Sequence, residues 1–447
     1  MMVRGRRLLA LVLVLGLARE GLAQDTALPA CVSGRTPVLA HLTLDDALRQ
    51  IVCVSPSLRR AGASVDEQRG GLASAKSTYL PRVNLQGEIA TNQIPGINSA
   101  AGYLSSSASA GLGFNWLLID YGARSAANRQ ANQGVRGAES ARENTLLLVF
   151  GDALKLYTDA ITAQSRREAL AQAVEIARQT LAVVEARKNA QASSLVEVLQ
   201  ARTALSQAEV DHGRAVGTWG TARGVLALAM GYPASQALVL APTSEALAGS
   251  RRALAQDGFS DETLEQHPLL RSLRADIDAA KARVDQIRAE AWGTISLSGT
   301  VSGTQSLQTS STPYSQISTS VALLAAVPLF DGGDRDGRLS QAVAQMQVRT
   351  ETFETASREL KVVIHTARQA VETESINAEG AKTLLAISTD AYDVAHGRYK
   401  SGVGSLTDLL TAQNAVTSAR LQLAQAEITL ASARVNLAIA EARFTLD

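Results

Sequence analysis

Apolar and polar residues alternate in four segments of the chain. In residues 83–89, Val-Asn-Leu-Gln-Gly-Glu-Ile, every odd position is apolar or glycine and every even position is polar. The same period of two recurs in three further segments, 112–118, 295–301 and 317–327. Successive side chains of a strand point to opposite faces of a sheet, so this period predicts four strands, each with one apolar face. Loops rich in Asn, Ser, Gly and Pro, at 92–105 and 305–313, would join the strands into two hairpins.

Each predicted β-hairpin is followed by a long stretch that lacks proline and carries apolar residues at spacings of three and four. These stretches cover residues 123–189 and 334–400. They are rich in Ala, Leu, Gln, Glu and Arg, which favour helices, and a helix of that length would be about 100 Å long. After short turns at 189–193 and 400–404, helical periodicity resumes for about 35 residues. Two long helical hairpins are therefore predicted.

The two halves of the chain resemble each other at an offset of 212 residues, which becomes 211 further on. The matching segments are 55–91 with 267–303, 116–125 with 327–336, and 193–205 with 404–416. A duplication of this period predicts one structural unit used twice.

The chain is expected to begin with a secretory signal peptide. Arg4, Arg6 and Arg7 precede an apolar run, 8–18, that is too short to span a bilayer, and small residues favour cleavage after Ala23. The predicted layout is a signal peptide (1–23), an N-terminal periplasmic helix (24–80), the first β-hairpin (81–120), the first helical hairpin (121–230), a connector (231–262), a helix of the second repeat (263–292), the second β-hairpin (293–331) and the second helical hairpin (332–447).

Two cysteines, Cys31 and Cys53, lie near the start of the exported chain. In an oxidising periplasm they are expected to form a disulfide. Two alternatives stay open. Residues 28–31 loosely resemble a lipid-attachment motif, which would make Cys31 a lipidation site, or the two thiols are unrelated.

No catalytic centre, cofactor or metal site is predicted. The five histidines lie in different segments without metal-ligand spacing, and neither a phosphate-binding glycine loop nor a nucleophile elbow is present. The formal net charge of +1 offers no basic excess for nucleic acid. Asp46 is interpreted as a helix-start residue, three positions after a capping Thr43.

The four strands are too few to close a barrel in one chain. An open sheet in lipid would leave the backbone groups of its edges unpaired, so identical subunits must close it. Three copies would give 12 strands, within the range of outer-membrane barrels. The fold expected is thus mainly α, with a trimeric transmembrane β-barrel that a tube of long helices continues.

This order of elements resembles the TolC-like outer-membrane factor family. The resemblance is carried by LTLDDAL (42–48), SPSLRRA (55–61), YLP (79–81), PLFDGG (328–333) and RYKSGVGSLTDLLTAQNAV (398–416). It implies a trimeric channel in the outer membrane that extends into the periplasm as a tunnel of 12 helices. It also implies a periplasmic adaptor and an inner-membrane pump, either an ABC exporter or a proton-driven pump, as partners.

The same resemblance implies site residues at the periplasmic tips of the helical hairpins. The adaptor-binding tips would be Asn189, Ser193, Ser194, Ser401, Gly402, Gly404 and Ser405, and the gate and constriction would be Asp408, Tyr399, Glu197 and Thr411. Thr411 stands where a second acidic residue is expected, and Gly404 stands where a gate arginine is expected. Asp408 and Glu197 have a further interpretation, as acids that favour the starts of returning helices.

Two functions follow from these patterns. The first is a passive conduit for drug efflux or type I secretion, of unknown cargo. The second is a periplasm-spanning structural or adhesive coiled coil without a pore. Amphipathic β-hairpins favour the conduit, because a scaffold does not need them.

Overall fold

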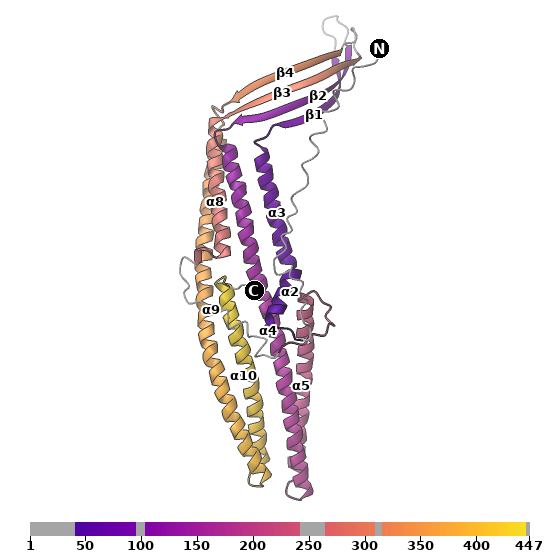
Figure 1. The fold of residues 1–447 in the computed structure, drawn as a ribbon, viewed down its shortest axis with the longest axis vertical. Coiled ribbons are helices and arrows are strands. Elements are labelled where there is room, and N and C mark those ends of the chain that lie inside the picture. Colours follow the sequence, from indigo (N-terminus) through magenta and orange to yellow (C-terminus); the bar gives the residue numbers. More distant parts are fainter. Residues whose placement is uncertain (1–40, 95–102, 242–263, 309–314, 444–447) are drawn as a thin grey trace.

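The computed structural model describes residues 41–94, 103–241, 264–308 and 315–443. The predicted signal peptide and Cys31 lie outside the described residues, so cleavage and the disulfide stay predictions; Cys53 lies half-buried near the end of α2 (Leu44–Val54). Figure 1 shows a long, narrow molecule with a four-stranded sheet at one end and the tips of two helical hairpins at the other.

The four predicted strands are present and form one antiparallel sheet in the order β1-β2-β3-β4. They are β1 (Arg82–Ile94), β2 (Tyr103–Ile119), β3 (Thr294–Gln308) and β4 (Ser315–Ala326). The loops expected to begin at residues 92 and 305 begin later, because cross-strand pairing continues to Ile94 and to Gln308. At these strand ends the residues are mostly polar, so apolar and polar positions no longer alternate. Backbone pairing extends the strands beyond the alternating segments.

The two faces of the sheet differ sharply in polarity. The register places Val83 opposite Phe114, and Phe114 opposite Gly299, so the apolar positions share one face. That face is exposed in the single chain; Ile89, for example, is 78% exposed. On the other face, hydroxyl groups pair across strands, as in Thr300 with Ser320 at 2.8 Å. Arg82 and Glu88 are the only charged residues within these four strands.

The helices match the predicted lengths closely. They are α2 (Leu44–Val54), α3 (Pro56–Ser77), α4 (Ala123–Asn189), α5 (Leu195–Ala229), α8 (Pro268–Ala289), the 3-10 turn η2 (Glu290–Trp292), α9 (Asp334–Lys400) and α10 (Leu406–Ala440). The single helix expected within 24–80 is wrong for the described part, which holds two helices. Pro56 cannot continue α2 because it lacks an N–H group, and it starts α3 after the cap Ser55.

The interpretation of Asp46 as a helix-start residue is confirmed. Thr43 is the N-cap of α2, and its hydroxyl accepts a hydrogen bond from the Asp46 backbone N–H at 3.3 Å. The hydroxyl also donates to the Asp46 carboxylate at 2.7 Å. The Asp46 side chain, although shorter than glutamate, therefore reaches the Thr43 hydroxyl three residues earlier, the spacing of a capping box.

The main hydrophobic core lies midway along the molecule, where α4 packs against α2, α5 and α10. Tyr157 of α4 is fully buried there and donates to the Leu42 carbonyl at 3.0 Å. Leu42 in turn pairs with Leu240 in a short β-bridge, which ties the described start of the connector to the N-terminal segment. The rest of the predicted connector lies outside the described residues. Among the described helices, none combines the length and hydropathy that crossing a bilayer requires.

The repeat determines how the helices neighbour one another. Towards the sheet, the helices follow the order α3-α4-α8-α9, and towards the tips the order is α5-α4-α10-α9. The chain is therefore a strip that is one helix deep for most of its length. Among the described elements, its two long edges have no neighbour; one edge is on the β1, α3 and α5 side and the other on the β4 and α9 side.

Candidate functional site at the hairpin tips

The turn between α4 and α5 brings Ser193 and Ser194 to the start of α5. Gln191 takes a left-handed conformation with φ of 59°, and the Ala192 N–H donates to the Arg187 carbonyl at 2.8 Å. Ser194 then caps α5, because its hydroxyl accepts from the Glu197 backbone N–H at 3.2 Å. The cap fixes Glu197 in the first turn of the helix.

The turn between α9 and α10 is built in the same way. Gly402 has φ of 88°, a conformation that glycine adopts without the steric cost of a Cβ atom. The Val403 and Gly404 N–H groups both donate to the Arg398 carbonyl at 3.0 Å. Ser405 caps α10 by accepting from the Asp408 backbone N–H at 3.1 Å.

A small hydrophobic cluster packs the two tips against each other. Its buried members are Val184, Val198, Ala201, Tyr399, Leu406 and Leu409, drawn from all four long helices. Tyr399 is only 1% exposed, so its ring is enclosed between the hairpins. The tips therefore move together unless this cluster opens.

The structure brings together two of the predicted gate residues. The Tyr399 hydroxyl donates to the Glu197 carboxylate at 3.1 Å, and the Ser193 hydroxyl donates to the same carboxylate oxygen. Burial raises the pKa of Tyr399, and Glu197 raises it further, whereas Ser193 and Arg187 act in the opposite direction. The phenol thus keeps its proton and remains a donor to Glu197.

The other two predicted constriction residues lie apart from this cluster. Asp408 is in the first turn of α10 with an exposed side chain, and Thr411 follows one turn later, also exposed. Both acids, Asp408 and Glu197, occupy helix starts, where the helix dipole favours negative charge. Both acids therefore lie at helix starts, as the second interpretation expected. Their roles in a constriction stay predictions.

Arg187, which the sequence patterns did not single out, makes two contacts with Tyr399. Its guanidinium lies over the Tyr399 ring, with 4.5 Å from the guanidinium carbon to the ring centroid. It donates to the Tyr399 carbonyl and, at 3.2 Å, to the Ala192 carbonyl. The repeat offered one signal, since an offset of 211 aligns Arg187 with Arg398, beside Tyr399.

Gly404, the position of the expected gate arginine, has little room for a side chain. A Cβ atom there would lie 3.0 Å from the Arg398 Cβ and 3.0 Å from the Tyr399 backbone nitrogen. The tight turn thus fits glycine, and a cation reaches Tyr399 from the other hairpin instead.

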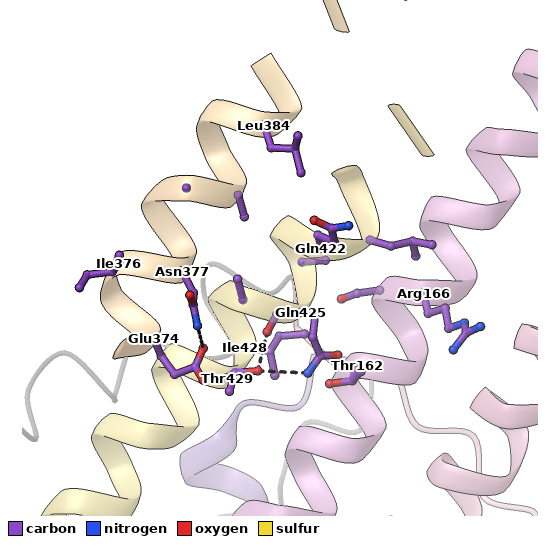
Figure 2. A pocket seen from close by; sticks show the side chains of 16 residues that line it. Thr162, Arg166, Glu374, Ile376, Asn377, Leu384, Gln422, Gln425, Ile428 and Thr429 are labelled. Carbon is purple, nitrogen blue, oxygen red and sulfur yellow. Dashed lines mark hydrogen bonds between the residues drawn. The ribbon is translucent and has the colours of Figure 1, made fainter. Parts of the chain in front are cut away.

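A groove of about 910 Å³ lies further from the tips, between α4, α9 and α10 (Figure 2). Amide, hydroxyl and aliphatic side chains line it. Several of them already pair with each other, such as Asn377 with Glu374 at 3.2 Å and Gln425 with Thr429 at 3.1 Å. This lining presents no nucleophile beside a base and no set of metal ligands. In the described part of the chain, no three His, Cys, Asp or Glu residues are grouped so that they could hold a metal ion.

The outer membrane efflux protein model matches residues 47–232 and 259–440, which covers both repeats. The chain belongs to this family. It is therefore an outer-membrane efflux protein rather than an enzyme, and the resemblance inferred from its motifs is confirmed. The family match covers the sheet, the helices and both tips, so the site described above lies within the shared fold.

Curated relatives align along nearly the whole chain. Protein CyaE of Bordetella pertussis is 30% identical over 416 residues, which are 90% of this chain and 86% of that protein. The toluene efflux pump outer membrane protein TtgI of Pseudomonas putida is 26% identical over 414 residues, 90% of this chain and 85% of that protein.

Solved structures share the fold at lower identity. CusC matches with a TM-score of 0.75 at 18% identity, covering 89% of this chain and 92% of that one. The outer membrane protein VceC of Vibrio cholerae matches with a TM-score of 0.72 at 16% identity, covering 90% of this chain and 97% of that one. The expected combination of a four-stranded sheet and long helical hairpins is confirmed.

Proposed function

We propose that three copies of this chain form a closed exit duct, which carries substrates passively from the periplasm or an inner-membrane pump to the exterior. The observation that carries the proposal is the pair of open edges that runs along the whole strip. At the sheet end, β1 and β4 each have one edge that no other described strand pairs with. Unpaired strand edges cannot face lipid, so β1 of one copy would pair with β4 of the next.

The helical edges support the same closure. Exposed aliphatic residues recur along α9 at Val348, Val362 and Ile376, fourteen residues apart. Helix α5 also exposes aliphatic residues, Leu199, Val210 and Leu228. Long helices are stabilised chiefly by packing an apolar stripe on a neighbour. In a ring, α9 of one chain would pack against α3 and α5 of the next.

The tips would form the periplasmic entrance of this duct. Tyr399 and Glu197 would hold the two hairpins of one chain together in the closed state through their hydrogen bond. Opening would then separate the returning hairpin α9–α10 from α4–α5. Asp408 would face the axis as a ring of three carboxylates, with Thr411 one turn behind it.

A periplasmic adaptor and an inner-membrane pump would complete the machine. The adaptor would contact the exposed turn residues Asn189, Ser194, Ser401, Gly402 and Ser405. Two relatives are named as outer membrane proteins of a toluene and a solvent efflux pump, which supports a pump as partner. The same duct would serve type I secretion equally well. In either case the pump, and not this chain, would select the cargo.

Two measurements on the detergent-solubilised full chain test the proposal. Mass determination should give a species of three chains, and insertion into a planar bilayer should give discrete conductance steps. A stable monomer would overturn the closure of the sheet between copies. A trimer that never conducts would instead support the periplasm-spanning coiled coil without a pore.

A further inference from the structure

Arg187 makes three contacts at the tip, and two of them reach the other hairpin. Its guanidinium covers the Tyr399 ring at 4.5 Å, and one of its nitrogens donates to the Tyr399 carbonyl. A second nitrogen donates to the Ala192 carbonyl at 3.2 Å, in the turn of its own hairpin. One planar group thus bridges the end of α9 and the turn between α4 and α5.

These contacts surround the same tyrosine whose hydroxyl reaches Glu197. The ring has Arg187 against its face and Glu197 at its hydroxyl, 3.1 Å away. Ser193 donates to the Glu197 carboxylate from the turn that Arg187 also holds through Ala192. Moving Arg187 would therefore release both the ring and the turn that positions the acceptor.

We propose that Arg187 is a positioning residue of the closing latch, and that it supplies the cation that the Gly404 turn has no room to carry. This rests on the proposed gate function of Tyr399 and Glu197. All the contacts of the latch lie within one chain: Arg187, Ala192, Ser193 and Glu197 belong to the first hairpin, and Tyr399 belongs to the second.

The chemistry of the site favours arginine over lysine. A guanidinium is planar, stacks on an aromatic face and donates in two directions at once, whereas an ammonium is a point charge. The half-buried position strengthens the attraction to the ring, because less water competes for the cation. Lysine at 187 would keep the charge near the ring, but it lacks the planar fork whose separate nitrogens reach the two carbonyl groups.

The test compares variants of the full chain in planar bilayers without adaptor or pump. Arg187→Met should raise the time spent open at rest by more than about tenfold, because losing a charged hydrogen bond alone predicts about tenfold and losing the stacked cation adds to it. Arg187→Lys should fall between Met and wild type. Arg398→Met is the matched control, because it removes the same side chain from the equivalent position of the second repeat, where it is exposed.

A double-mutant cycle with Tyr399→Phe separates positioning from general weakening. If Arg187 positions the tyrosine hydroxyl, the effect of Arg187→Met should be smaller in the Tyr399→Phe background, where only its own contacts with the ring and the carbonyl groups are left to lose. Trimer mass and helical circular dichroism, measured for every variant, ensure that only assembled channels are compared.

The possible outcomes are distinguishable. A wild-type chain that never conducts would refute the proposed duct itself. If Tyr399→Phe opens the channel but Arg187→Met behaves like Arg398→Met, the duct and latch stand and the role of Arg187 is overturned. Additive effects in the cycle would also overturn it, since they would show that Arg187 acts apart from Tyr399.

Discussion

The environment of Tyr399 shows how single residues hold the tip closed. The ring of Tyr399 is buried among apolar side chains, and its hydroxyl therefore needs a hydrogen-bond acceptor. The Glu197 carboxylate accepts this hydrogen bond at 3.1 Å. The carboxylate would repel a phenolate, so the contact requires the protonated form of Tyr399. The latch thus depends on the protonation state of one side chain.

We expect the closed state to weaken only at alkaline pH. Burial, followed by Glu197, raises the pKa of Tyr399, while an unfolded tyrosine titrates near about 10. The stabilising contribution is therefore complete below about pH 10 and is lost as pH rises through the raised value. Resting conductance of the trimer should stay flat from neutral pH to about 10 and rise above it.

Tyr399→Phe is the control for this pH profile. It should conduct at rest about tenfold more than wild type, as loss of a hydrogen bond to a charged acceptor predicts, and should show no alkaline rise. A wild-type increase already between about pH 7 and 9 would contradict the assignment, because Tyr399 keeps its proton there.

At the scale of elements, α4 and α9 show what a sequence pattern can predict. Both were expected to be 67 residues long, and both are. Their bounds were readable because no proline interrupts them and a turn with left-handed residues ends each one. The division into α2 and α3 was not predicted, although Pro56 directly after the capping Ser55 is a helix-start signal in the sequence.

The tip cluster shows what the sequence could not predict. Tyr399 and Glu197 could be predicted, because the motifs around them resemble those of the family. Arg187 could not, because its contact with Tyr399 spans 212 residues and depends on how two hairpins pack. Arginine recurs throughout the long helices, so composition gave no reason to select this one.

His267 gives a prediction for one element, the start of α8. Its imidazole Nδ1 accepts from the Leu269 backbone N–H at 3.2 Å, and the residue is buried. Burial lowers the pKa of His267, so the ring is neutral in the folded protein. The cap's stabilisation is present above the unfolded pKa of about 6.5 and is lost as pH falls through the lower folded value.

Acidification should therefore loosen the start of α8. We expect faster amide exchange at Leu269 and a lower unfolding temperature at pH 5 than at pH 7.5. His267→Asn should remove most of this difference, because asparagine caps helices without titrating, a contribution of about 1 kcal/mol. His365→Asn, at an exposed position on α9, should leave the pH dependence as in wild type. Equal acid sensitivity in both variants would assign the effect to another group.

At the scale of the whole molecule, the repeat makes a strip that closes only with copies of itself. In the described part of the chain, the sheet, the helices next to it and the helices near the tips all leave the same two edges open. Because each chain contributes two hairpins, a trimer would surround its axis with six similar units. The two hairpins differ in their contacts at the tips, because Arg187 covers the ring of Tyr399 whereas its equivalent in the second repeat, Arg398, is exposed.

Asp408 gives the prediction that belongs to the assembled molecule. It is exposed in the first turn of α10, and three copies around one axis would place like charges together. Such a ring attracts cations, as acidic rings do in cation channels. Asp408→Asn should lower the ratio of cation to anion permeability towards unity and raise the concentration of a trivalent cation needed for block about tenfold. Bilayer recordings at low salt give the clearest reading, because charge effects are least screened there.

A matched charge removal far from the tips distinguishes the ring from general electrostatics. Asp66 of α3 is exposed, and Asp66→Asn removes one negative charge per chain away from the entrance (Figure 1). Selectivity and block should then stay as in wild type. If Asp408→Asn also leaves both unchanged while lowering the unfolding temperature, Asp408 serves the start of α10 alone. The narrowest part of the duct would in that case lie at another level of the tunnel.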